Sequence, residues 1–299
     1  MTTENYRCGF IAIVGRPNVG KSTILNTLLG QKISITSPKP QTTRHRITGI
    51  KTTAQAQFIF VDTPGMHVLK KKAINRYMDR TAGSALQGVD IVIMVVDCQR
   101  WTEEDDYVVQ RVGHAGIPVV LAVNKIDRLT RKEDVLPVLQ EYAKKTTCEA
   151  IVPVSAYSGN NIEELQQILL KMLPEGPPQY AEEQITDRSE RFMAAEIIRE
   201  KLMRKLSSEV PYSISVEIET FKEEGALRRI GAIIWVERAG QKKIVIGRKG
   251  EGLKDVGKQA RIDMEKLFGG KVFLELWVKV REGWADNDRA LKSLGYDDL

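Results

Sequence analysis

The chain has 299 residues, of which 42% are apolar and 28% charged, so it can form ordinary cores in two domains. It contains no run of 18 or more apolar residues, and its polar start, residues 1–7, leads straight into an apolar run. We therefore expect neither a transmembrane helix nor a signal peptide. Its three cysteines are far apart and form no Cys-X-X-Cys pair, which argues against disulfides or a zinc site and for reduced thiols in the cytosol.

Residues 1–173 alternate short apolar runs with longer amphipathic stretches. The apolar runs are 10–14, 57–61, 91–96, 119–123 and 151–154, and the amphipathic stretches include 71–86, 103–112 and 135–145. Near-continuous Val and Ile runs separated by helices are typical of parallel strands that are buried on both faces. We therefore predict a doubly wound, mainly parallel α/β domain whose ligand binds beyond the carboxyl ends of the strands.

A phosphate-binding loop follows the first apolar run. Gly15-Arg-Pro-Asn-Val-Gly-Lys-Ser22 fits the pattern GxxxxGK[ST], in which backbone N–H groups and a helix N-terminus surround phosphates. Lys21 is expected to reach the β- and γ-phosphates, and Ser22 to place its hydroxyl on Mg²⁺. The nucleotide contacts predicted from this loop are Gly15, Arg16, Pro17, Asn18, Val19, Gly20, Lys21, Ser22 and Thr23.

A second motif, Asp62-Thr-Pro-Gly65, follows the next run and fits DxxG. Asp62 is expected to hold Mg²⁺ through water, and the Gly65 amide to sense the γ-phosphate, with Thr63 and Pro64 completing the contact. Alone, this sequence could be a simple turn. Its position about forty residues after the phosphate loop favours the nucleotide-binding interpretation.

A third motif selects the base. Asn124-Lys-Ile-Asp127 fits NKxD, and Asp127 can accept two hydrogen bonds from guanine that adenine cannot donate. Lys125 can cover the base, and Asn124 can brace the site. After the last apolar run, the backbone amides of Ser155 and Ala156 are candidates for contacting guanine O6. In this order, the motifs predict a protein that binds GTP and GDP.

The segment Gln41-Thr-Thr-Arg-His45 lies between the first two motifs and has the position of a switch that closes on the γ-phosphate. Thr42 or Thr43 should meet Mg²⁺, and we favour Thr43 without separating the two. The predicted metal ligands are thus Ser22, Thr43 and Asp62. The predicted catalytic set is Lys21, Thr42, Thr43 and Gly65.

Met66 follows the glycine of DxxG, where many small GTPases place the glutamine that orients the attacking water. A methionine cannot do this by hydrogen bonding. We therefore expect slow intrinsic hydrolysis that uses backbone groups, a switch residue, a cation or a partner. Asn18 is a candidate for holding a monovalent cation such as K⁺ beside the phosphates.

The rhythm changes at residues 174–188, which begin with a Pro- and Gly-rich linker. We place a second domain at 189–283 and a tail at 284–299. The predicted order is a helix over 189–206 capped by Asp187 or Ser189, strands at 214–221 and 230–237, a glycine loop at 247–250, a helix at 251–268 and a strand at 272–280. This is a small α+β domain.

The loop Gly247-Arg-Lys-Gly250 fits the GxxG signature with which KH domains clamp about four nucleotides. GxxG alone is a weak motif, but residues 242–261 contain seven basic residues against two acidic ones. The predicted RNA contacts are Ile246, Gly247, Arg248, Lys249, Gly250, Lys254 and Lys258. Other residues are assigned no such role: Trp235, Trp277 and Trp284 are expected to be packing residues, and His45, His67 and His114 show no metal-ligand spacing.

From about Phe10 to Tyr296, the chain resembles the bacterial Era GTPase family. The resemblance is carried by GRPNVGKS, QTTRHR, DTPG, NKID and VSA, then by ITDRSERFMAAEIIREKLM, VIGRKG and LELWVKVREGWADNDRALKSLGY. An N-terminal GTPase joined to a C-terminal type II KH domain is a highly specific combination. Met66 fits a family in which a hydrophobic residue replaces the usual glutamine, and Leu253 is a mild departure where KH loops often have isoleucine.

The resemblance implies a role in late assembly of the small (30S) ribosomal subunit, with the KH domain binding the single-stranded 3′ end of 16S rRNA and a nearby helix. It also implies a cytoplasmic protein, mostly monomeric, with some association with the inner face of the cell membrane. The residues alone lead only to a GTP switch coupled to an RNA-binding module. In such a switch, GTP orders 41–45 and the segment from Asp62 to Lys72, which then contact the KH domain or its RNA.

Three alternatives follow from the same residues. A tRNA-modifying GTPase partner would usually show a further catalytic or cofactor constellation, which we do not find. A membrane-associated signalling or cell-cycle GTPase would use the C-terminal domain to bind a protein or another RNA, and would not need Arg248 and Lys249 for binding 16S rRNA. A metabolic P-loop kinase is disfavoured by the NKxD motif.

Overall fold

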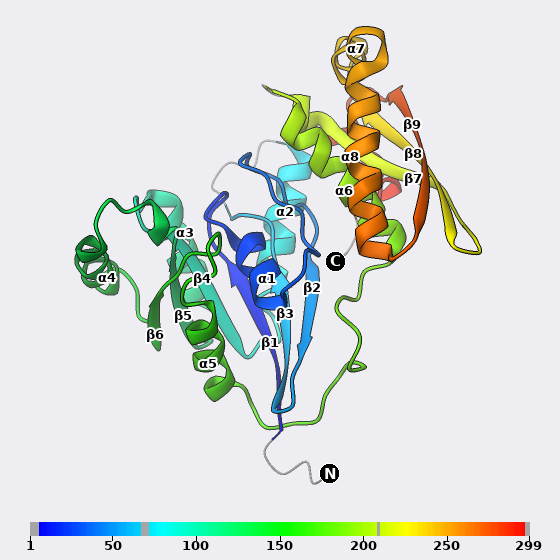
Figure 1. The fold of residues 1–299 in the computed structure, drawn as a ribbon. Helices are drawn as coiled ribbons and strands as arrows, with labels where there is room; N and C mark the ends of the chain where they lie inside the picture. The colour runs from blue at the N-terminus through cyan, green and yellow to red at the C-terminus, as the bar shows by residue number, and fades with distance from the viewer. Residues whose placement is uncertain (1–5, 67–71, 208–209, 297–299) are drawn as a thin grey trace.

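The computed structural model describes residues 6–66, 72–207 and 210–296. Its first domain is built on one six-stranded sheet in the order β2-β3-β1-β4-β5-β6 (Figure 1). Its strands are β1 (Arg7–Val14), β2 (Ile47–Thr52), β3 (Ala56–Asp62), β4 (Ile91–Asp97), β5 (Val119–Asn124) and β6 (Ala150–Pro153). All neighbouring pairs are parallel except β2 with β3. The predicted doubly wound α/β fold is therefore confirmed.

Helices cover both faces of this sheet, because its strands carry apolar side chains on both sides. One face packs against α1 (Lys21–Leu29) and α5 (Ile162–Met172). The other packs against α2 (Ala73–Ser84), α3 (Glu103–Gly113) and α4 (Val135–Ala143). The phosphate loop, DxxG and NKxD follow β1, β3 and β5, so the parallel pairing gathers all three motifs at one edge of the sheet.

The edge strand β2 was not predicted. Its sequence mixes Ile47 and Ile50 with threonine, lysine and glycine, which is not the continuous apolar run of a central strand. A Cβ at Gly49 would lie 2.7 Å from the Leu29 side chain, so the missing side chain lets α1 approach the strand.

The linker is laid along the first domain. Backbone N–H groups of Gln179 and Tyr180 donate to Oε1 of Gln57 at 2.7 and 2.9 Å, and the Ile50 amide donates to the Ile185 carbonyl at 2.9 Å. These bonds hold the segment between α5 and the next helix against β2 and β3. Its path brings the second domain to the motif-bearing edge of the first (Figure 1).

The second domain has a three-stranded sheet in the order β7-β8-β9, with α6 and α8 on one face (Figure 1). Its elements are α6 (Glu190–Lys205), β7 (Ile214–Glu224), β8 (Leu227–Val236), α7 (Ala239–Ile246), α8 (Glu251–Phe268) and β9 (Lys271–Val280). Ser189 caps α6 by accepting from the Phe192 amide at 3.2 Å, as predicted. Helix α7 was missing from the predicted order. The apolar residues before the glycine loop form the last turn of this helix.

The tryptophans of the C-terminal part differ in burial. Trp284 is fully buried, whereas Trp277 is 43% exposed on the sheet face away from the helices, where its ring lies over Gly231. Residues of the predicted tail form a short turn (Trp284–Asp286) and α9 (Asp288–Ser293), which pack on α2 of the first domain. No helix in the described part of the chain is long and apolar enough to cross a bilayer.

Candidate functional site

The phosphate loop has the compact form that its glycines permit. A Cβ at Gly15 would lie 2.4 Å from the Val95 carbonyl oxygen, and one at Gly20 would lie 2.3 Å from Nδ2 of Asn124. The Lys21 ammonium lies inside this loop and donates to the carbonyls of Gly15 and Arg16, both at 3.0 Å. Burial lowers the pKa of Lys21 to about 8, because a buried ammonium loses its hydration.

The predicted metal ligands come together at one point. Ser22 Oγ donates to Asp62 Oδ2 at 2.6 Å and lies 2.8 Å from Thr43 Oγ1. The Thr42 hydroxyl instead donates to the Lys39 carbonyl at 2.6 Å. Of the two threonines, Thr43 is therefore the one placed beside Ser22 and Asp62.

Asp62 is suited to bind a cation. Its carboxylate is fully buried, and its Oδ1 atom has no hydrogen-bond partner among the described residues. Burial raises the pKa of Asp62, and hydrogen bonds from Ser22 and Ser34 and the charge of Lys21 oppose this. Three hard oxygen ligands with one unsatisfied carboxylate oxygen fit Mg²⁺.

The base-binding motif is braced by its own side chains. Asn124 donates to the Val19 carbonyl at 2.8 Å and accepts from the Ala156 amide at 3.0 Å. Ser155 Oγ donates to Asp127 Oδ1 at 2.5 Å, which holds the carboxylate in place. In this structure the Ala156 amide thus bonds to Asn124, so its predicted contact with guanine O6 would share or replace that bond.

Lys125 joins the base motif to the phosphate loop. Its ammonium donates to the Asn18 carbonyl and to Asp97 Oδ2, both at 2.7 Å. Asp97 was not predicted as part of the site, although it directly follows a predicted strand, as Asp62 does. The strand-end rule could therefore have found it.

The side chains of two predicted nucleotide contacts, Arg16 and Thr63, bond to other parts of the GTPase domain. Arg16 extends to Asp105 Oδ2 at 2.9 Å, and the Thr63 hydroxyl donates to the Ile13 carbonyl at 2.9 Å. Met66 is fully buried in the core under α2 and α3, consistent with a residue that takes no part in orienting water. The phosphate pocket is lined by Pro17, Asn18, Gly20, Lys21, Ser22, Thr23, Ile35, Thr36, Ser37, Gln41, Thr42, Thr43 and Gly65.

The glycine loop of the second domain connects α7 to α8. Gly247 and Gly250 have φ of 74° and 82°, and Lys249 between them has φ of 48°. A Cβ at Gly247 would lie 2.9 Å from the Gly252 backbone nitrogen, so this turn requires glycine. Exposed cations surround the loop, as the sequence predicts for a phosphate-binding surface. These are Arg248, Lys249, Lys254 and Lys258.

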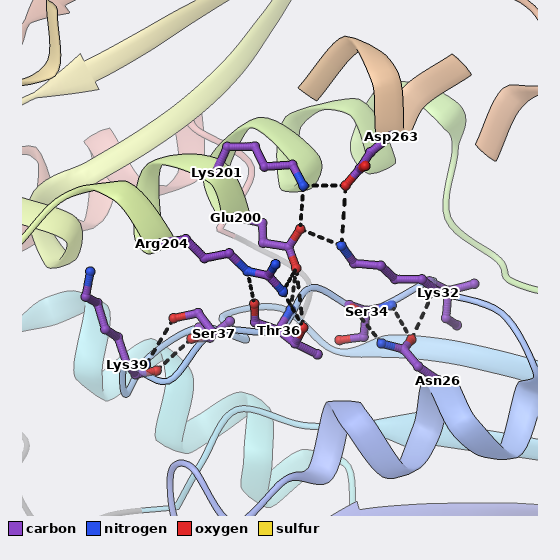
Figure 2. A network of polar contacts seen from close by, with 12 residues as sticks. Asn26, Lys32, Ser34, Thr36, Ser37, Lys39, Glu200, Lys201, Arg204 and Asp263 are labelled. Carbon is purple, nitrogen blue, oxygen red and sulfur yellow. Dashed lines mark hydrogen bonds and ion pairs between the residues drawn. The ribbon is translucent and has the colours of Figure 1, made fainter. Parts of the chain in front are cut away.

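The two domains meet along residues 32–46, which include the predicted switch at 41–45 and which we call the switch segment. Figure 2 shows its first half against α6, where Lys32 and Thr36 contact Glu200. Further along, Lys39 donates to the carbonyls of Met203 and Leu206 at the end of α6. No sequence signal predicts these contacts, because they pair residues more than 160 positions apart.

The second half of the switch segment enters the second domain. The Arg44 side chain is fully buried and donates to the carbonyls of Ile214 and Tyr212 at 2.7 and 3.0 Å. The His45 ring stacks on Tyr296 of the C-terminal segment, with ring centroids 4.7 Å apart. Of the predicted switch from Asp62 to Lys72, residues 67–71 lie outside the described residues, and His67 is among them.

The fold and the two loops define a P-loop, guanine-nucleotide-binding domain joined to a KH domain. Comparison with family models agrees. Residues 10–125 match the model described as 50S ribosome-binding GTPase, and residues 209–285 match the KH domain.

The chain is 57% identical to "GTPase Era" of Pseudomonas aeruginosa over 293 residues, which cover 98% of this chain and 96% of that protein. It is 56% identical to "GTPase Era" of Azotobacter vinelandii over the full length of both. The chain therefore belongs to the Era family, and it is a GTPase.

Two solved structures share both domains. One is Era in complex with MgGDPNP and nucleotides 1506–1542 of 16S ribosomal RNA, and the other is an Aquifex aeolicus Era variant bound to GDP·AlF4⁻. Each has a TM-score of 0.94 and 42% identity, and the alignment covers 97% of this chain and 99% of the other.

Proposed function

We propose that this GTPase is a switch that binds the 3′ end of 16S rRNA through its KH domain and acts in assembly of the 30S subunit. The main support for this proposal is that the switch segment lines the phosphate pocket and also forms hydrogen bonds with α6 of the KH domain. A change at the γ-phosphate can therefore alter the KH domain directly. The related Era structure that contains both a GTP analogue and 16S rRNA supports the choice of ligands.

In the nucleotide site, Ser22, Thr43 and Asp62 would hold Mg²⁺, which neutralises phosphate charge when bound. Lys21 would bind the β- and γ-phosphates, and the Gly65 amide would contact the γ-phosphate. Asp127 would select guanine, with Asn124 and Ser155 holding its geometry. Because Met66 is buried, the attacking water would be oriented by backbone groups, a residue of the switch segment, a cation or a partner.

K⁺ is a second candidate cation. Nδ2 of Asn18 donates to the Pro38 carbonyl of the switch segment at 2.9 Å, at the edge of the phosphate pocket. A monovalent cation there would be held by oxygens from both segments and would add positive charge near the phosphates. Faster hydrolysis in K⁺ than in Na⁺ is expected, and equal rates would remove this part of the proposal.

In the KH domain, the GxxG loop and its exposed cations would bind the RNA backbone, with Ile246 beside the bases. Family resemblance supports a mostly monomeric cytoplasmic protein, part of which associates with the inner face of the membrane. Cell fractionation with and without added GTP would test this location.

The decisive experiment measures binding of a labelled RNA that matches the 3′ end of 16S rRNA. A non-hydrolysable GTP analogue is compared with GDP, and the wild type with a Gly247→Asp, Gly250→Asp variant. Tight binding that favours the GTP state and is lost in the variant is expected. Failure of the wild type to bind this RNA in any nucleotide state would refute the proposal and point to a protein or another RNA as partner.

A further inference from the structure

A buried carboxylate of the KH domain lies in the domain interface. The Glu200 side chain on α6 is completely buried, and one of its oxygens accepts from the Thr36 amide at 2.9 Å. The other oxygen lies 2.5 Å from the Lys32 ammonium (Figure 2). Lys201 and Arg204 of the same helix complete its surroundings at 3.4 and 3.1 Å. Glu200 thus binds two residues of the GTPase domain at once.

Those two residues flank a contact with the metal site. Ser34, between Lys32 and Thr36, donates from its hydroxyl to Asp62 Oδ2 at 2.8 Å. Asn26 of α1 fixes the same residue, because its Oδ1 accepts from the Ser34 amide and its Nδ2 donates to the Ser34 carbonyl (Figure 2). Thr36 itself lines the phosphate pocket. A shift of Glu200 relative to the GTPase domain would therefore move groups that touch Asp62 and the phosphates.

The network also reaches the helix that follows the GxxG loop. Lys201 donates to both Glu200 and Asp263, and Lys32 lies 3.6 Å from Asp263. Asp263 is on α8, whose N-terminus begins directly after Gly250. Because a helix is a stiff element, displacement of the loop by a ligand moves Asp263 as well.

We propose that Glu200 is a positioning residue of the GTPase site, contributed by the KH domain. It holds the first half of the switch segment over the phosphate pocket. Through Lys201 and Asp263 it also connects this part of the switch segment to α8. The link to α8 rests on the proposed RNA function, whereas the positioning of the switch segment does not. A buried carboxylate suits this role, because its two partners in the GTPase domain, Lys32 and Thr36, lose their common acceptor when the domains separate.

The test uses the full-length Glu200→Gln variant, which keeps an acceptor for the Thr36 amide but removes the charge. Affinities for GDP and for a non-hydrolysable GTP analogue are measured together with kcat and KM for GTP. We expect GDP affinity to be unchanged and the preference for the GTP analogue to fall about tenfold, within the range of about 5–150-fold typical of coupling between sites. The kcat should fall with it, because the switch segment is held less well.

The matched control is Glu190→Gln. Glu190 lies on the same helix and pairs with Arg228 inside the KH domain at 2.7 Å, so its loss should leave the nucleotide preference unchanged. If Glu200→Gln does not fold, Lys32→Met removes the other end of the contact. The Lys32 side chain is 41% exposed, and this variant should show the same loss of preference.

Measured outcomes separate this inference from the proposed function. Unchanged nucleotide preference and kcat in both Glu200→Gln and Lys32→Met would overturn the positioning role, whatever the RNA result. If the wild type binds RNA better with the GTP analogue, Glu200→Gln should lose most of that difference, and its full retention would overturn the link to α8. RNA binding by the wild type that is absent or equal in both states would instead count against the proposed function.

Discussion

At the scale of single residues, the burial of Met66 predicts a role in stability and no direct role in hydrolysis. The side chain is fully buried among apolar residues and so has no access to a water at the phosphates. We expect Met66→Ala to lower the free energy of unfolding by about 2–5 kcal/mol through the cavity that it leaves. Hydrolysis should stay within a few-fold of wild type under conditions where the variant is folded. Met66→Leu, which nearly preserves volume, should cost less than about 1.5 kcal/mol. A loss of hydrolysis of several hundred-fold in Met66→Ala, with nucleotide binding unchanged, would contradict this.

The lowered pKa of Lys21 gives nucleotide binding a pH dependence. Without nucleotide, the folded protein holds Lys21 with a pKa of about 8, because burial disfavours the ammonium. Bound phosphates favour the charged form, so binding above this pH takes up a proton and must weaken as pH rises. Titrations from about pH 7 to about pH 9 should show GDP affinity falling above pH 8. Guanosine, which lacks phosphates, is the control, and an equal fall for both ligands would show that Lys21 is not the cause.

At the scale of elements, the C-terminal segment caps a helix of the other domain. Oδ1 of Asp286 accepts a hydrogen bond from the Ala73 amide at 3.0 Å, at the N-terminus of α2. The N-cap residue of this helix, Lys72, makes no capping hydrogen bond with its side chain. Asp286→Ala should therefore destabilise the protein by about 1 kcal/mol, as measured by thermal or denaturant unfolding. Faster hydrogen exchange in α2 should accompany this loss. Asp288→Ala removes an exposed ion pair with Arg76 at 4.0 Å and an exposed acidic residue in the first turn of α9, and it should have a smaller effect. Equal effects of the two substitutions would argue against a capping role.

Elements were predictable where one physical cause dominated their sequence. The four central strands of the first sheet, β1, β3, β4 and β5, are apolar runs because both of their faces are buried. Helix α8 matched its predicted bounds because a glycine stands at each end. Strand β2 lies at an edge, so its pattern is weak. Helix α7 contains a glycine and β-branched residues and is held by contacts with α8 and β9. In the candidate site, motif spacing predicted Ser22, Asp62 and Asp127, and the structure places Ser22 in contact with Asp62. Ser34 and Glu200 could not be predicted, because only the tertiary structure places Ser34 against Asp62 and Glu200 against Lys32 and Thr36.

At the scale of the whole molecule, the GTPase and KH domains share one interface that contains the switch segment, α6 and the C-terminal segment. Burial of Arg44 with its bonds to Ile214 and Tyr212 makes separation of the domains costly, since a charged group would lose its acceptors. Nucleotide state and RNA occupancy are therefore expected to be linked. Such linkage is reciprocal. The first factor is the ratio of RNA affinity with a GTP analogue bound to RNA affinity with GDP bound. The second is the factor by which bound RNA raises the preference of the protein for the analogue over GDP, and the two must be equal.

This equality can be measured on the full-length protein. RNA affinity is determined with saturating GTP analogue and with saturating GDP, and the affinities for both nucleotides are determined with and without saturating 16S 3′-end RNA. The two ratios should agree and exceed about fivefold, which is the lower end of typical coupling. The Gly247→Asp, Gly250→Asp variant should retain nucleotide binding while RNA at the same concentration no longer alters it. Ratios of one in the wild type would mean that the shared interface is only structural, and that the two domains bind their ligands independently.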